Sequence, residues 1–252
     1  MSPIAFRQHG QGRPILLIHG FPFHQAIWDD YIRFLSSSFL VITVDLPGFG
    51  KSPMLPAPLS LAGVGDALLE FITQQKFEKI GLIGHSLGGY VALAMIEKNP
   101  TLFSALVLFH STAYADSTEK KDSRLKGVEF VKKNGATAFT TTFIPPLFAD
   151  QQHPAIEKVK RISAAASDEA VIGYTLAMRD RPEQIKTLER FKNPTLFLAG
   201  KKDPGIPVDS VIKQASYCQN PQIHILENAA HMGMFELPDE TAAQIKDFLA
   251  QT

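Results

Sequence analysis

The chain has 252 residues, of which 45% are hydrophobic and 20% charged, and its formal net charge is zero; this is enough to bury a large core within one α/β domain. Neutrality argues against a nucleic-acid partner and against a polybasic membrane-binding surface, because both need clustered positive charge. No apolar run approaches the roughly 18 residues that span a bilayer, and the N-terminus lacks the apolar segment of a secretory signal, so we expect a cytoplasmic protein.

Short runs rich in Val, Ile, Leu and Phe alternate with helical patterns along the chain. The runs predict strands that are covered on both faces, and they are ILLI (15–18), LVITV (40–44), KIGLI (79–83), ALVLF (105–109), TLFLA (195–199) and QIHIL (222–226). Residues 4–8 predict a short edge strand ahead of Gly10. Apolar side chains at helical spacing lie between the runs, as in Leu61, Val64, Leu68 and Ile72, in Val91, Ala94 and Met95, and in Ala242, Ile245, Phe248 and Leu249. This alternation predicts a mostly parallel, doubly wound sheet.

The alternation fails in residues 111–190, where only helical patterns occur. Asp116 with Glu119 resembles a capping box, and Asn134-Gly135 predicts the end of that helix. Ser167 predicts the start of another helix. We therefore expect an α/β core made of residues 1–110 and 191–252, with residues 111–190 inserted as a helical cap.

Two groups of side chains in this insertion have different interpretations. The charged residues Lys120, Lys121, Asp122 and Arg124 are interpreted as a solvated helix face. The apolar residues in its middle are Phe139, Phe143, Ile144, Leu147 and Phe148. They either bury the insertion against the core or line an apolar pocket, and Phe143 is our candidate among them for a substrate contact.

Residues 84–89 read GHSLGG and follow the apolar run 79–83. Gly84, Ser86 and Gly88 have the G-x-S-x-G spacing of a nucleophile elbow, where a serine stands at a sharp strand-to-helix turn and small neighbours relieve the crowding. The first N–H groups of the following helix favour an anion. We interpret Ser86 as a nucleophile and the N–H of Leu87 as a donor to an oxyanion.

A serine hydroxyl is a weak nucleophile until a base takes its proton, and a carboxylate must orient that base. His231 follows the run 222–226, and Asp203 follows the run 195–199. Both residues are therefore expected at the carboxyl ends of parallel strands, the edge that also presents Ser86. The chain order Ser86, Asp203, His231 is the one expected for this architecture.

These motifs, together with HGFP (19–22), VDLPGFGKS (44–52) and AHMGMFELP (230–238), resemble the α/β-hydrolase fold family and its serine esterase, lactonase and bromoperoxidase-like branch. The resemblance covers essentially the whole chain, more loosely in residues 111–190. It implies a Ser86–His231–Asp203 triad under a helical cap inserted after the sixth strand of the family's fold. It also implies that the N–H of Phe21 is the second oxyanion donor. The family often opens with a two-strand hairpin, of which only one strand fits ahead of Gly10.

Other polar or aromatic residues near the strand ends have structural interpretations. Asp45 is expected to hydrogen-bond its loop, His19 to hold the HGFP loop, and His85 to pack beside the elbow. Trp28 and His110 follow strand ends, where packing is the expected role. Trp28 is kept, with Phe143, as a candidate substrate contact.

The sequence predicts a serine hydrolase that acts on small, mainly apolar carboxylic esters or lactones, with water as the second substrate. Cys218 is the only cysteine, and neither a paired-His helix nor a complete glycine fingerprint occurs, so no metal or organic cofactor is expected. The same triad can also cleave carbon–carbon bonds of diketones, transfer acyl groups or form peracids. Outside enzymes, the fold can serve as a ligand receptor with an idle triad. The physiological substrate and the oligomeric state stay open.

Overall fold

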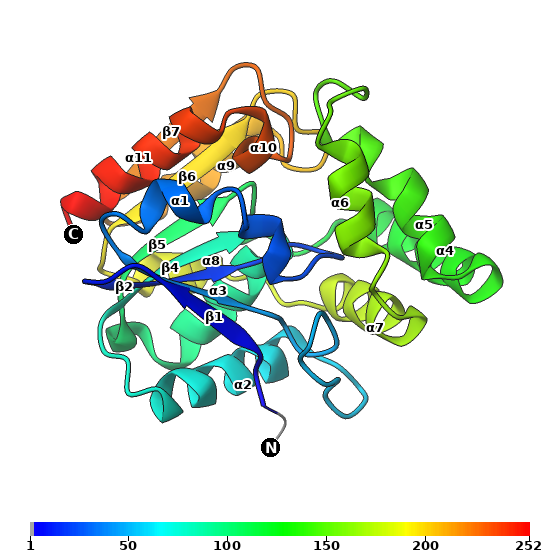
Figure 1. Ribbon diagram of the computed structural model, residues 1–252, viewed down its shortest axis with the longest axis horizontal. Coiled ribbons are helices and arrows are strands. Elements are labelled where there is room, and N and C mark those ends of the chain that lie inside the picture. Colours follow the sequence, from blue (N-terminus) through cyan, green and yellow to red (C-terminus); the bar gives the residue numbers. More distant parts are fainter. Residues whose placement is uncertain (1–2) are drawn as a thin grey trace.

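The computed structural model describes residues 3–252, and within them seven strands form one sheet (Figure 1). The strands are β1 (Phe6–His9), β2 (Pro14–Ile18), β3 (Leu40–Val44), β4 (Ile80–His85), β5 (Phe103–Phe109), β6 (Thr195–Gly200) and β7 (Pro221–Leu226). Their order across the sheet is β1-β3-β2-β4-β5-β6-β7. The edge strand β1 runs antiparallel to β3, and the other described pairs are parallel. The mostly parallel sheet predicted from the apolar runs is confirmed, and β1 is the single strand expected ahead of Gly10.

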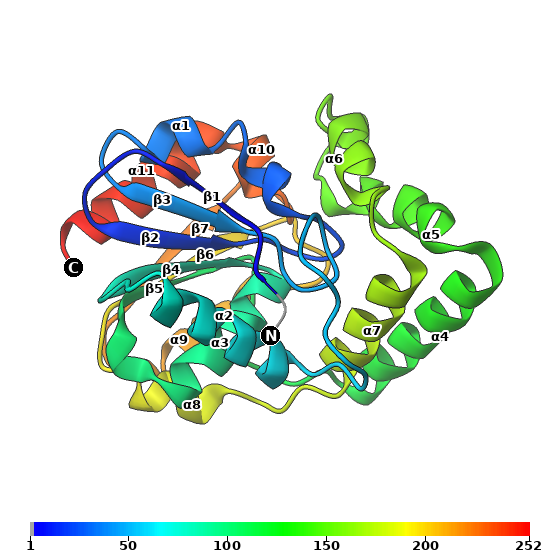
Figure 2. The same ribbon diagram turned by 60° about the horizontal axis from the view of Figure 1, so that its bottom comes forward.

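Helices cover both faces of this sheet (Figure 2). On one face lie α2 (Leu61–Gln74), α3 (Leu87–Lys98), α8 (Ile185–Arg190) and α9 (Val208–Ala215); on the other lie α1 (Ile32–Leu35), α10 (Gly233–Glu236) and α11 (Pro238–Ala250). Side chains alternate between the two faces along a strand, so Leu16 and Ile18 of β2 join one core, whereas Ile15 and Leu17 join the other. The three predicted apolar stripes are buried on α2, α3 and α11. The doubly wound arrangement is therefore confirmed.

The strandless stretch between β5 and β6 contributes four helices that lie together at one end of the molecule (Figure 1). They are α4 (Thr118–Asn134), α5 (Ala136–Phe143), α6 (Ile156–Ser163) and α7 (Asp168–Arg179). Helix α4 packs along α7 and against α5. It ends before Gly135, whose φ of +82° suits glycine. The hydroxyl of Ser167 accepts a hydrogen bond from the N–H of Ala170 at the start of α7, as the sequence predicts.

The start of α4 differs from the prediction. The capping side chain is Ser117, which accepts the N–H of Lys120 at 3.3 Å, so the capping box assigned to Asp116 is wrong. Asp116 is instead buried and paired with Arg124 and Arg181. A buried carboxylate needs such partners, and these come from residues too far along the chain for a local pattern to reveal.

The boundaries of the cap, residues 111–190, stay a prediction. Helix α8 lies within this range but does not stand with the other helices of the insertion (Figure 2). Helix α8 contacts α3 beneath the sheet, whereas α4–α7 stand together at the other end (Figure 2). The insertion follows β5, which is the sixth strand of the family's fold when the hairpin strand absent from residues 3–252 is counted.

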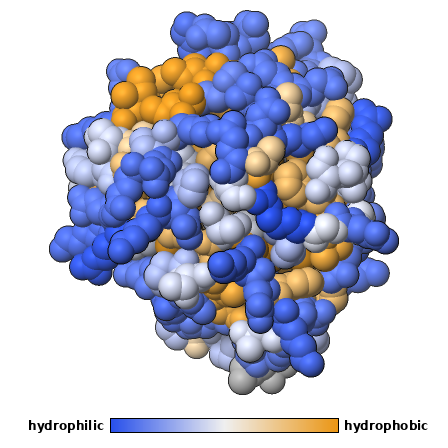
Figure 3. All heavy atoms as spheres, turned by 90° about the vertical axis from the view of Figure 1, so that its left-hand side faces the viewer, coloured by the Kyte–Doolittle hydropathy of each residue, from blue (hydrophilic) through white to orange (hydrophobic). Residues whose placement is uncertain are grey.

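Among residues 3–252, no helix is both long enough and hydrophobic enough to cross a bilayer. The end of the molecule opposite α4–α7 is mainly hydrophilic, with a hydrophobic patch at the upper left of the view (Figure 3).

Short 3-10 helices span Gln25–Trp28, Pro100–Leu102 and Pro145–Leu147.

Candidate active site

Ser86 stands at a strained turn between β4 and α3. Its φ is +51° and its ψ is −114°, in a region that residues with a side chain seldom adopt. A Cβ on Gly84 would come 2.5 Å from the carbonyl oxygen of Gly88, and one on Gly88 would come 2.3 Å from that of Ile18. The spacing G-x-S-x-G is therefore required by the close approach of α3 to β4 and β2.

The backbone of Ser86 is fixed on both sides by β5 and the residues after it. Its N–H donates to the carbonyl oxygen of Phe109 at 2.9 Å. Its own carbonyl oxygen accepts a hydrogen bond from the hydroxyl of Ser111 at 2.7 Å. Such surroundings hold an unfavourable backbone conformation in place.

His231 and Asp203 form a hydrogen-bonded pair. His231 Nδ1 lies 2.6 Å from Asp203 Oδ2, and each residue is only 8% exposed. The other carboxylate oxygen of Asp203 accepts the N–H groups of Gly205 at 2.8 Å and Ile206 at 3.1 Å. Burial raises the pKa of Asp203, but His231, His110 and the Gly205 N–H together lower it to about 2. The carboxylate is therefore ionised near neutral pH, and Nδ1 of His231 carries the proton that it donates to Asp203.

The main chain of His231 is held from two directions. Its N–H donates to the carbonyl oxygen of Leu147 at 2.9 Å. Its carbonyl oxygen lies 2.9 Å from Nε2 of the buried His85. Burial lowers the pKa of His85 well below its usual value, so this ring is neutral, and the proton on Nε2 is donated to His231. The packed role expected for His85 is confirmed.

His110 is a neighbour of Asp203 for which packing is the only role expected from the sequence. It is fully buried directly after β5, with a φ of +49°. Its Nδ1 lies 3.7 Å from Asp203 Oδ2 and 3.2 Å from the Gly200 nitrogen, and its Nε2 lies 3.2 Å from the Gly233 nitrogen. Burial lowers the pKa of this ring to about 3, so His110 is a neutral side chain packed against the carboxylate.

Potential metal-ligand atoms of His110, Asp203 and His231 lie within 4.8 Å of one another. The His231–Asp203 hydrogen bond at 2.6 Å already occupies one atom of each of these two residues. The unprotonated nitrogen of the neutral His110 ring accepts a backbone N–H, that of Gly200 or that of Gly233. A metal would have to displace these contacts, so we assign the cluster to hydrogen bonding.

Two N–H groups are expected to face an oxyanion. That of Phe21 lies on the loop after β2, and that of Leu87 lies at the start of α3. Within residues 3–252, neither the N–H of Phe21 nor that of Leu87 meets an acceptor. His19 fixes this loop: its Nδ1 lies 2.8 Å from the Gly20 carbonyl oxygen, and its Nε2 accepts the N–H of Leu46 at 2.9 Å. Burial lowers the pKa of His19 to about 4, which keeps the ring neutral. The loop-holding role expected for His19 is confirmed.

Asp45 ties the loop after β3 to the segment after β2. Its two carboxylate oxygens accept the N–H of Gln25 at 2.8 Å and that of Lys51 at 2.9 Å. Its carbonyl oxygen accepts the hydroxyl of Ser52. The structural role predicted for Asp45 is confirmed.

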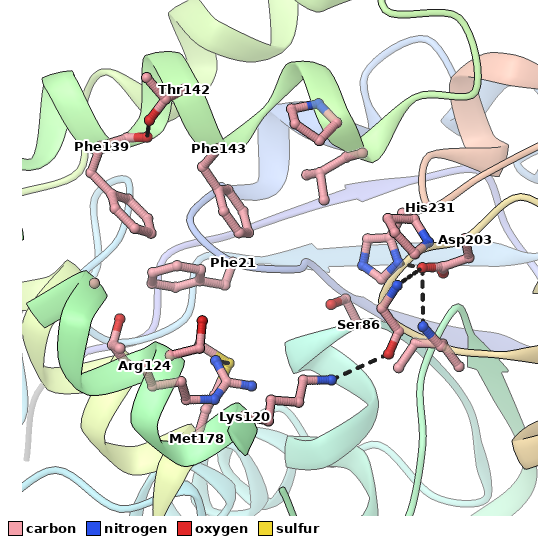
Figure 4. Close-up of a pocket in the computed structure, with 18 of the residues that line it drawn as sticks. Phe21, Ser86, Lys120, Arg124, Phe139, Thr142, Phe143, Met178, Asp203 and His231 are labelled. Carbon is pink, nitrogen blue, oxygen red and sulfur yellow. Dashed lines mark hydrogen bonds and ion pairs between the residues drawn. The ribbon is translucent and has the colours of Figure 1, made fainter. Parts of the chain in front are cut away.

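A cavity of about 490 Å³ lies between the strand ends and α4–α7. Ser86, His231 and Asp203 stand at one end of it (Figure 4). Its lining residues are Phe21, Ser86, Tyr90, Lys120, Ser123, Arg124, Gly127, Phe139, Thr142, Phe143, Pro146, Leu147, Thr175, Met178, Asp203, Pro204, Gly205, Ile206 and His231. The apolar middle of the insertion divides: Phe139, Phe143 and Leu147 line the cavity, whereas Ile144 and Phe148 are buried in the core.

The structure removes one candidate substrate contact and corrects one interpretation of side chains near the cavity. Trp28 does not reach it, because this side chain is 0% exposed and lies among Tyr31, His85 and Phe109. Lys120 and Arg124 do not belong to a purely solvated face, because both line the cavity. Helix α4 packs along α7 and α5, and this packing decides which of its faces turns inward.

Comparison with known proteins identifies the family of this chain. The sequence profile of the alpha/beta hydrolase family matches residues 15–244. The chain belongs to the alpha/beta hydrolase family. Its structure superimposes with a TM-score of 0.93 on a thermophilic esterase from Thermogutta terrifontis, solved with malate bound, which is 31% identical; the match covers 99% of this chain and 94% of that one.

Two further similarities reach across nearly the whole alpha/beta hydrolase chain. A bromoperoxidase from Bacillus anthracis has a TM-score of 0.89 at 22% identity, over 99% of this chain and 96% of that one. The (E)-2-((N-methylformamido)methylene)succinate hydrolase of Acinetobacter baylyi is 24% identical, over 97% of this chain and 93% of its own length. The family and the fold expected from the motifs are thus confirmed, and relatives of this kind support an enzyme of hydrolase type.

Proposed function

We propose that this alpha/beta hydrolase is a serine hydrolase that cleaves small, mainly apolar carboxylic esters or lactones through an acyl-enzyme on Ser86. The observation that carries the proposal is the shared cavity: the strained Ser86 opens into the same space as the hydrogen-bonded His231–Asp203 pair. Membership of a hydrolase family with esterase relatives supports it further.

The proposed reaction gives each residue one task. Nε2 of His231 takes the proton of Ser86 as its oxygen attacks the carbonyl carbon. The N–H groups of Phe21 and Leu87 stabilise the negative charge on the carbonyl oxygen, and a donor of this kind typically contributes about 2.7–4 kcal/mol. His231 then protonates the leaving alcohol and activates the water that cleaves the acyl-enzyme. Asp203 stays ionised and holds the proton of His231 on Nδ1.

The lining of the cavity supports a mainly apolar substrate of modest size. A volume of about 490 Å³ lies within the range of pockets for small molecules. The rings of Phe139 and Phe143 stack with their centroids 5.3 Å apart, and Phe21 meets Phe143 edge-on at 5.9 Å. An apolar acyl chain or lactone ring packs well against such a surface.

Hydrolysis of a panel of simple alkyl esters, lactones and one diketone tests the proposal. We expect turnover of esters or lactones that falls by at least about a thousandfold in Ser86→Ala. The matched control Ser37→Ala, which alters an exposed serine, should keep wild-type rates. Ester hydrolysis in Ser86→Ala within tenfold of wild type would contradict the nucleophile assignment, and Ser86-dependent cleavage of the diketone alone would contradict the substrate class.

A further inference from the structure

The cavity has two unlike walls (Figure 4). One is aromatic and consists of Phe21, Phe139 and Phe143. The other, called here the cationic wall, consists of Lys120 and Arg124, which are one turn apart on α4. Ser86 stands between them at the end of the cavity. An apolar site for neutral esters has no need of the second wall.

The charge of Arg124 is only partly balanced by protein groups. Its partner Asp116 is fully engaged, because the same carboxylate also receives Arg181 at 2.8 Å. Two guanidinium groups thus share one carboxylate. Arg181 does not line the cavity: it donates to the Met178 carbonyl oxygen and stacks over the Tyr90 ring at 4.0 Å. Arg124 is the member of this trio that lines the cavity, with a side chain that is 16% exposed.

Lys120 has no acidic partner among residues 3–252 of the structure. Its ammonium group donates one hydrogen bond, at 3.2 Å, to the carbonyl oxygen of Gly205. Asp203 is the single carboxylate among the cavity-lining residues, and His231 and two N–H groups already engage it. The cationic wall therefore carries uncompensated positive charge that faces the cavity.

We propose that the substrate is an ester that bears a free carboxylate remote from the scissile bond, such as the monoester of a dicarboxylic acid. Lys120 and Arg124 bind this carboxylate, while the apolar chain lies along the aromatic wall and the ester reaches Ser86. Charge-assisted hydrogen bonds of this kind are stronger than neutral ones, and the partly enclosed cavity screens them less than bulk water does. The inference rests on the proposed ester hydrolysis and narrows its substrate class.

The contact of Lys120 with Gly205 allows a competing explanation. Gly205 follows Asp203 closely in the chain, so Lys120 links α4 to the loop of the candidate catalytic acid. If Lys120 served only to make this link, removing its ammonium group would slow the hydrolysis of all esters alike. If Lys120 binds the substrate's carboxylate, its loss lowers the preference for anionic esters. The ratio between two matched substrates is therefore the decisive quantity.

Monomethyl adipate and dimethyl adipate form such a pair, because they share the chain and the scissile methyl ester. We expect kcat/KM to be about tenfold higher or more for the monoanion in the wild type. Lys120→Gln should lower this ratio about tenfold and Lys120→Glu should invert it, whereas the exposed neighbour Lys126→Gln should keep it. Arg124 is left unchanged, because its loss would leave the buried Asp116 with one partner.

Calorimetric binding of both compounds to Ser86→Ala reports the preference without turnover. We expect tighter binding of the monoanion, and a loss of that difference when Lys120→Gln is added. Equal binding of the two compounds, or an equal weakening of both by Lys120→Gln, would overturn the inference. Preferential binding without any hydrolysis by the wild type would refute the proposed function alone, whereas Ser86-dependent hydrolysis with no anion preference would refute this inference alone.

Discussion

At the scale of single residues, the ionised state of Asp203 is the feature on which the proposed chemistry depends. Burial raises the pKa of Asp203, but His231, His110 and the Gly205 N–H outweigh this effect and lower it to about 2. Asp180, the carboxylate that follows α7 in the insertion, is exposed and paired with Arg179. It therefore cannot orient His231.

Asp203→Asn should lower kcat/KM on a simple ester by about 10⁴-fold, because the imidazole loses the acceptor that keeps its proton on Nδ1. Steady-state kinetics at pH 7 measure this. Asp180→Asn is the control and should remain within about twofold of wild type. Near wild-type activity of Asp203→Asn would mean that another group orients His231.

Sequence reasoning could place Ser86, Asp203 and His231 because each lies in a short motif at the end of an apolar strand. It failed for Lys120 and Arg124, which are surrounded by other charged residues and show no local sign of facing a cavity. Their direction depends on the packing of α4 against α7 and α5. It failed for Trp28 for the same reason: a residue after a strand end faces either the cavity or the core, and tertiary packing decides which.

At the scale of elements, the β4–α3 elbow leaves no room for a side chain at Gly88. A Cβ there would lie 2.3 Å from the Ile18 carbonyl oxygen, which belongs to β2 and cannot move without disturbing the sheet. By contrast, a Cβ on Gly127 within α4 would meet Phe139 at an ordinary 3.5 Å. The two glycines thus differ in whether the fold requires them.

Gly88→Ala should destabilise the protein by about 2 kcal/mol or more, because the added methyl group must displace main-chain atoms. Gly127→Ala should stabilise it by about 0.5–1 kcal/mol, since alanine is the better helix former. Urea unfolding of both variants measures these changes. A Gly88→Ala protein as stable as wild type would show that the elbow is looser than its geometry implies.

The strands and long helices could be predicted because their burial leaves a regular apolar pattern. The short helix α1, of four residues, carries too few positions to show such a pattern. The sequence pattern places the N-cap of α4 one residue too early, because Asp116 and Ser117 are both good capping residues. Only the pairing of the buried Asp116 with Arg124 and Arg181 decides between them.

At the scale of the whole molecule, the three histidines that are fully buried among residues 3–252, His19, His85 and His110, link stability to pH. Burial lowers the pKa of His19 to about 4, that of His110 to about 3, and that of His85 well below its usual value. In the unfolded chain such groups titrate near ~6.5. Between about pH 6.5 and pH 4 the unfolded state therefore binds more protons, and stability falls as the pH falls. Asp203 adds to this loss only at lower pH, between about 3.8 and 2.

We expect the free energy of unfolding to decrease steeply from pH 6.5 towards pH 4, with each buried histidine contributing up to about 1.4 kcal/mol per pH unit. Urea unfolding monitored at pH 7, 6 and 5 measures the slope. Stability that is constant between pH 7 and pH 5 would contradict the neutral, buried state assigned to these rings.

Covalent labelling with a fluorophosphonate, followed by peptide mass spectrometry, tests whether Ser86 is an activated nucleophile. We expect one labelled peptide, modified at Ser86 in the segment GHSLGG. Labelling should be absent in Ser86→Ala and slowed by orders of magnitude in His231→Gln, while Ser37→Ala labels as the wild type does. An unlabelled folded protein, or a label on any residue other than Ser86, would contradict this role of Ser86.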